Sequence, residues 1–145
     1  MEKQAKSKIQ NVKFAHADEF WDFLPADEKR ISIRLKKLVM ECLPLAKESL
    51  SFNVLYYKGN KMICFIWPSS ILWGRHKTYE GVRFGLAYGN LIWDDQNFWE
   101  KGNRKQVVWK EFKQEKDIPV EELKFFLFQA LEVDKEWKRK KQGKS

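Results

Sequence analysis

The chain has 145 residues, of which 43% are hydrophobic and 15% aromatic, and this composition predicts one folded domain and excludes a disordered protein. No apolar run reaches the roughly 18 residues that a membrane-spanning helix requires, which excludes such a helix. The polar beginning of the chain predicts no secretory signal, and Cys42 and Cys64 lie in apolar surroundings. We therefore expect a cytoplasmic protein with buried, reduced thiols.

The net charge of +8 is concentrated at the two ends of the chain. Residues 1–14 and 136–145 are rich in lysine and arginine, whereas the sequence between them is nearly neutral. We expect a flexible basic arm over 1–14, a single domain over 15–137 and a basic tail over 138–145. A nucleic-acid-binding domain usually carries its basic residues on a folded face, so the pattern argues against nucleic acid as the partner. The alternative is weak, non-specific binding through the basic ends.

Two helices are predicted at the start of the body. Residues 17–24 form the first, because Phe20, Phe23 and Leu24 share one face at helical spacing. Residues 27–43 form the second, which Pro44 ends, and its apolar stripe comprises Ile31, Leu35, Leu38, Val39 and Cys42.

The pattern then changes to the alternation of β-strands. Residues 50–57 predict one strand and residues 62–67 its hairpin partner, with a turn over 58–61. Further strands are predicted over 71–76, 82–88 and 105–112. Gly85 lies inside one of them, which indicates a bulge or the close approach of another backbone.

A closing helix is predicted from about Asp117 to Lys140, with Pro119 in its first turn. The expected fold is therefore α+β: two N-terminal helices, an antiparallel sheet of about five strands and a C-terminal helix, with the helices on one face of the sheet.

Three segments together resemble the YdhG-like family of domains of unknown function, in the superfamily that also holds YjbR and the frataxin homologue CyaY. The first is the paired-helix start, ADEFWDFLPADEKRISIRLKKLVMECLPLAKESL. The second is LSFNVLYYKGNKMICFIWP, in which the matching residues are Ser51, Phe52, Tyr57, Gly59 and Lys61. The third is GVRFGLAYGNLIWDDQNFWEKGNRKQVVWKEF, in which the matching residues are Gly89, Leu91, Asp94, Glu100, Gly102 and Lys105.

The resemblance covers about residues 17–137 and implies an α+β fold with an antiparallel sheet. It implies no agreed activity, although some relatives are described as frataxin-like iron chaperones. The chain departs from the family at Asn53, Val54 and Leu55, where the family has Gly-Met-Pro, so a function of that segment does not carry over.

The residues needed for catalysis do not form a recognisable pattern. His16 and His76 belong to no metal-binding or nucleophile motif, and both cysteines lie on faces that we expect to be buried. No phosphate loop, nucleophile elbow or CxxC motif is present in the sequence. We therefore predict that the protein is not an enzyme.

Carboxylates near the first helix suggest an alternative. Asp18, Glu19 and Asp22 lie close together in the sequence, and oxygen ligands suit iron. Acidic residues at a helix start, however, are mostly caps and partners of the helix dipole. We expect no cofactor, with a frataxin-like iron chaperone that uses these three carboxylates as the alternative.

Aromatic and basic residues gather on or near the third and fourth predicted strands: Trp73, Arg75, His76, Arg83, Tyr88 and Trp93. If helices cover one sheet face, the other face is solvated or occupied, and Trp and Arg are enriched in binding hot spots. We expect a non-enzymatic binding or accessory domain that recognises a small molecule or a protein partner on this open face, helped by the loop 93–105. A homodimer is left open, and so is the reading in which the tryptophans fill the core.

Overall fold

The computed structural model describes residues 13–143 and the side chains of residues 13–140. Two helices come first, α2 (Ala17–Phe23) and α3 (Ala26–Cys42). Five strands follow: β1 (Lys47–Ser51), β2 (Val54–Lys58), β3 (Met62–Pro68), β4 (Val82–Leu86) and β5 (Val108–Phe112). Two 3₁₀ turns, η1 (Gly89–Leu91) and η2 (Glu115–Asp117), flank β5, and α4 (Val120–Gly143) closes the order.

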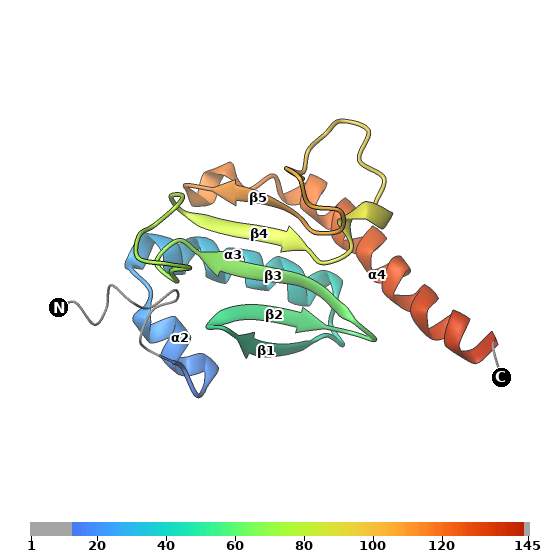
Figure 1. Ribbon diagram of the computed structural model, residues 1–145, viewed down its shortest axis with the longest axis horizontal. Coiled ribbons are helices and arrows are strands. Elements are labelled where there is room, and N and C mark those ends of the chain that lie inside the picture. The colour runs from blue at the N-terminus through green and yellow to red at the C-terminus, as the bar shows by residue number, and fades with distance from the viewer. Residues whose placement is uncertain (1–12, 144–145) are drawn as a thin grey trace.

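The strands form one sheet in the order β1-β2-β3-β4-β5, and every neighbouring pair is antiparallel. Helices α3 and α4 lie across one face of this sheet, and α2 lies near one of its ends (Figure 1). The predicted α+β class, with two helices before the sheet and one after it, is confirmed. No helix within residues 13–143 is long and apolar enough to span a bilayer.

The main core lies between the sheet and the two long helices. Leu55, Ile66 and Phe84 are cross-strand neighbours on the helix-facing side, and none of them is exposed. Leu35 of α3 and Leu127 of α4 are equally inaccessible. Burial of such side chains supplies the main driving force for folding, so this layer fixes how the helices cover the sheet.

Both cysteines are free and buried, on α3 and on β3. Burial raises the pKa of both the Cys42 and the Cys64 thiols, which disfavours the reactive thiolate. We expect neither cysteine of the native protein to react with Ellman's reagent at pH 8 within minutes, and both to react at once in 6 M guanidinium. Rapid labelling of the native chain would contradict this packing.

The prediction of a single strand over 50–57 is wrong, because the chain turns back at its centre. Ser51 pairs with Val54, which leaves a two-residue hairpin loop, Phe52 and Asn53, with φ angles of 53° and 64°. Positive φ at both positions is the geometry of a type I′ turn. The alternating pattern therefore belongs to two strands, β1 and β2.

The predicted strand over 71–76 is also wrong. Residues 69–81 form an irregular connection between β3 and β4, and Gly74 adopts a φ of 108°, which a strand does not allow. The Trp67 Nε1–H donates to the Ile71 carbonyl at 2.7 Å and so holds the start of the connection beside β3. Ile71, Leu72 and Trp73 are apolar or aromatic enough to resemble a strand, but residues 71–76 do not belong to any of the five strands of the sheet.

The predicted chain ends are partly outside the described residues. Residues 1–12 of the predicted arm lie outside the described residues. Phe14, by contrast, is buried, and its N–H donates to Asn53 Oδ1 at 2.9 Å. At the other end, α4 continues to Gly143, so the basic residues from Lys138 to Lys140 belong to a helix.

Candidate partner-binding surface

The structure distributes the six predicted site residues over three places. Arg83 lies on the sheet face that the helices leave uncovered. Tyr88 and Trp93 contact α4 instead, and Trp73, Arg75 and His76 lie on the exposed 69–81 connection. The six residues therefore do not form one open-face site.

Arg83 is bound within its own sheet. Register places it between Trp67 of β3 and Glu111 of β5, on the uncovered face. Its Nε and Nη2 both donate to Glu111 Oε2, at 3.0 and 2.6 Å. The guanidinium also lies 4.0 Å from the ring centre of Tyr79 and 3.9 Å from that of Trp109. Most of its capacity for ionic and cation–π contacts is therefore already used.

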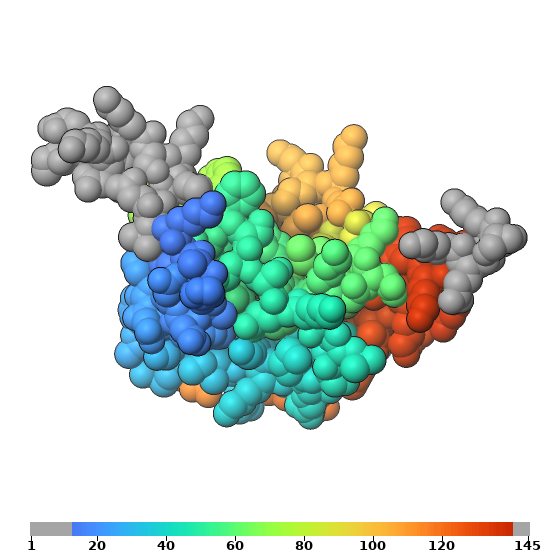
Figure 2. Space-filling view, turned by 90° about the horizontal axis from the view of Figure 1, so that it is seen from below, coloured from blue at the N-terminus to red at the C-terminus, as the bar shows by residue number. Residues whose placement is uncertain are grey.

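A second guanidinium, that of Arg104, lies 3.4 Å from the ring centre of Trp109. Its Nε donates to the Val107 carbonyl and its Nη2 to the Glu100 carbonyl, which ties down the loop before β5. Burial, followed by the nearby charge of Arg83, lowers the pKa of Arg104. In Figure 2 this gold-coloured loop projects from the molecule on the side opposite α3.

The centre of the uncovered face is closed by an aromatic side chain. Phe65 is buried although no helix covers it, because its ring lies across Gly85 of β4 and beside Tyr56 of β2. A Cβ at Gly85 would come within 2.2 Å of Phe65 Cζ and 2.7 Å of the Val108 carbonyl oxygen. The close approach predicted at Gly85 is confirmed, and the open face is largely filled by the chain's own side chains.

Tyr88 and Trp93 lie by α4. Tyr88 packs against Trp137 with ring centres 5.3 Å apart, and it lines a cavity of only about 10 Å³, which has room for about one water molecule. The Trp93 backbone exchanges two hydrogen bonds with the Gln129 amide, while its indole is 67% exposed. Trp99, from the same loop, is buried against Phe84 and Phe126. The loop is thus anchored by Trp99, and Trp93 is left at the surface.

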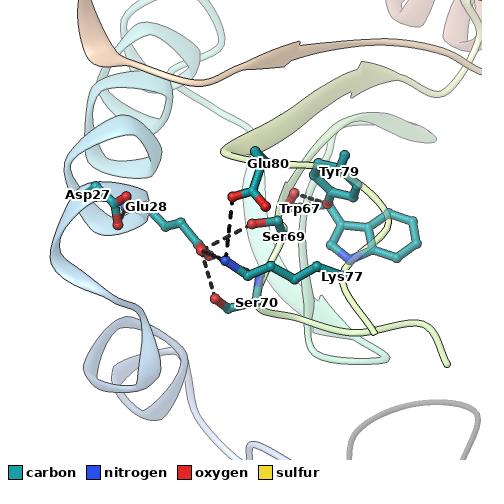
Figure 3. Close-up of polar contacts among 8 residues, drawn as sticks. All are labelled: Asp27, Glu28, Trp67, Ser69, Ser70, Lys77, Tyr79 and Glu80. Carbon is teal, nitrogen blue, oxygen red and sulfur yellow. Dashed lines mark hydrogen bonds and ion pairs between the residues drawn. The ribbon is translucent and has the colours of Figure 1, made fainter. Parts of the chain in front are cut away.

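The connection 69–81 is held by a buried carboxylate, which keeps its exposed residues in place (Figure 3). Glu28, in the first turn of α3, accepts hydrogen bonds from Ser69 Oγ at 3.1 Å, Ser70 N at 3.0 Å and Ser70 Oγ at 2.7 Å. Lys77 Nζ lies 3.3 Å from the same carboxylate. Between these anchors, Trp73, Arg75 and His76 project from a braced loop.

The most unusual surface feature is a pair of exposed rings, Phe52 and Trp73, which we call the aromatic rim. Their ring centres are 6.0 Å apart with the planes at 85°, and they are 67% and 57% exposed. Phe52 holds this position with a φ of 53°, in the left-handed region that costs an L-residue about 1–2 kcal/mol. Asn, Asp and Gly are the residues that usually occupy such a turn.

The three carboxylates of the iron alternative are exposed around α2. Glu19 Oε1 accepts hydrogen bonds from the N–H groups of Ala15 and His16, at 2.5 and 3.3 Å, and these bonds lower the pKa of Glu19. Its carboxylate therefore caps the helix. Within residues 13–143 no group of three or more His, Cys, Asp or Glu side chains is placed to hold a metal ion.

Comparison with protein-family models, curated proteins and solved structures finds no match for this chain. The resemblance to the YdhG-like family therefore stays a prediction.

Proposed function

We propose that this chain is a non-catalytic, cytoplasmic binding module that recognises a protein partner through the aromatic rim and the neighbouring Arg75 and His76. The observation that carries the proposal is the backbone of Phe52. A bulky side chain in a left-handed conformation that is also exposed adds little to the core and weakens the turn. Such a residue is accounted for if its ring has a role at the surface.

The chemistry of the rim fits a protein segment that carries an apolar side chain next to a carboxylate. Large aromatic rings supply most of the energy at protein interfaces, and Trp and Arg are enriched among the residues that dominate it. Arg75 and His76 are exposed, and within the described part of the chain neither is in an ion pair. Arg75 is thus available to a carboxylate, which a guanidinium binds through two hydrogen bonds.

A small molecule is a weaker fit to the same residues. Small ligands are usually enclosed by a concave pocket, whereas Phe52 and Trp73 stand out from a hairpin turn and a loop. Neither of the two cavities described for residues 13–140 is lined by either ring. A protein surface can provide the missing enclosure.

The proposal is tested by photo-cross-linking in cells that produce the chain. A photoreactive phenylalanine replaces Trp73 in one variant and Leu45 in the other, because Leu45 is 91% exposed in the segment between α3 and β1. We expect a discrete cross-linked protein from position 73 and none from position 45, and we expect Arg75→Glu to abolish it. A product that consists of two copies of this chain identifies the partner as a homodimer mate. No product from position 73, or the same products from both positions, would reject the proposal.

A further inference from the structure

A groove on the helix-bearing side of the molecule carries unpaired positive charge. It has a volume of about 670 Å³ and lies between α3 and the segment that follows β5. Arg30 and Arg34 line it from α3, and Lys113 and Lys116 line it from the other wall. Its carboxylates are Asp27 and Glu115, so cations outnumber anions by four to two.

The fold places the two arginines together. Arg30 and Arg34 are four residues apart on α3, so they lie on the same face of the helix, where like charges repel by about 0.2–0.5 kcal/mol. Within residues 13–140, none of the four cations that line the groove is in an ion pair. Asp27 forms no ion pair with any of them in the described part of the chain, and its Oδ1 accepts a hydrogen bond from Glu28 N at 2.8 Å.

Two apolar side chains also line the groove. Ile31 and Ile118 line it from the two walls, and both are buried. A groove of this volume falls in the range of about 300–1,000 Å³ that small-molecule sites occupy. The site thus combines room for a small molecule, two apolar lining side chains and four cations that form no ion pair among the described residues.

We propose that this groove binds a small molecule that carries two or more phosphate groups. Two cations on each wall match an anion with at least two charged centres, because each phosphate can be held from both sides. Guanidinium groups bind phosphate oxygens through paired, charge-assisted hydrogen bonds, and lysine adds point charge. A ligand of this class would also relieve the repulsion between Arg30 and Arg34. The proposal is independent of the aromatic rim, which none of the groove residues belongs to.

Isothermal titration calorimetry with inorganic pyrophosphate, at an ionic strength near 0.1 M, tests the site. We expect saturable binding of one pyrophosphate per chain, with orthophosphate weaker. Arg34→Gln with Lys116→Gln should weaken binding about a hundredfold, since each lost charge-assisted contact is worth about tenfold. The matched control is Lys101→Gln with Lys105→Gln, which removes the same charge from the exposed loop before β5 and should change affinity less than twofold. Circular dichroism establishes that both variants are folded.

Three outcomes would overturn the assignment. One is the absence of saturable pyrophosphate binding up to about 10 mM, which is far weaker than a site with four cations should allow. Another is equal weakening in the groove variant and the loop control, which would indicate a response to net charge alone. The last is an oligonucleotide that displaces pyrophosphate and binds with the same dependence on Arg34 and Lys116, which would make the groove a nucleic-acid surface.

Discussion

Replacing Glu28 with alanine should cost about 3–5 kcal/mol of unfolding free energy, the range found when one partner of a buried charged network is removed. Glu28 is only 2% exposed, and its carboxylate accepts hydrogen bonds from Ser69, Ser70 and Lys77. Alanine would leave the buried Ser69 hydroxyl and the partly buried Ser70 N–H without their acceptor, and a fully buried group of this kind costs about 1–3 kcal/mol. Because single domains are stable by about 5–15 kcal/mol, the variant should be close to unfolding.

Urea denaturation of Glu28→Ala beside Asp27→Ala measures this effect. Asp27 is the neighbouring carboxylate, but it is exposed and accepts only the Glu28 N–H among the hydrogen bonds described, so its loss should cost about 1 kcal/mol or less. Glu28→Gln keeps the shape of the side chain and one acceptor oxygen. Its loss of unfolding free energy should lie between those of Glu28→Ala and Asp27→Ala. If Glu28→Ala were no more harmful than Asp27→Ala, the buried carboxylate would not be the anchor of the 69–81 connection.

The second large effect is expected at Gly85. Gly85→Ala should cost about 3 kcal/mol, at the upper end of the usual penalty for overpacking, because the new methyl group would collide with the Phe65 ring and the Val108 carbonyl. The ring could move only by giving up its contact with Tyr56. The Val108 oxygen belongs to the β5 backbone, so the β4–β5 pairing would shift as well.

A double-mutant cycle separates these two causes. Phe65→Leu removes the outer ring atoms, Cζ and Cε2, that approach Gly85 most closely. We expect Gly85→Ala to lower the unfolding free energy by at least about 1 kcal/mol less in the Phe65→Leu background than alone, because mutations of residues in contact are not additive. If guanidinium denaturation showed that the double variant loses the sum of the two single losses of unfolding free energy, Phe65 would not close the uncovered face over Gly85.

The regular elements were predictable because their signals are local. The apolar spacing of Ile31, Leu35 and Val39 defines α3, and all three are buried as expected. The close approach at Gly85 was visible as a glycine inside a strand. These features depend on neighbouring residues only, which is why the α+β architecture followed from the sequence.

The β1–β2 hairpin was missed because its turn carries no common turn residue at Phe52. Eight residues of alternating apolar character, without Gly or Pro, favour one continuous strand, and Asn53 was the only residue there that tolerates positive φ. The aromatic rim therefore could not be anticipated, although Trp73 was among the predicted site residues. Trp73 meets Phe52 only because Glu28 of α3 holds the connection 69–81, which is a tertiary contact.

The contacts of Arg83 also depend on tertiary structure. Sequence alternation placed Arg83 correctly, opposite Val82 and Phe84, which are both buried. It could not show that Glu111 and Trp109, 28 and 26 positions later, would meet Arg83 across β4 and β5. The same limit applies to the basic groove, whose two walls are about 80 residues apart in the chain.

Phe52→Asn, measured for both stability and partner capture, tests the central claim most directly. Asparagine tolerates the left-handed conformation, so relief of strain should offset the lost contact with Trp73, and stability should stay the same or rise by up to about 1 kcal/mol. The yield of the cross-linked partner from position 73 should nevertheless fall about tenfold or more, as expected for the loss of a hot-spot ring. A variant that loses more than about 1 kcal/mol of stability and still captures the partner would show that Phe52 serves the fold, and it would contradict the proposed function.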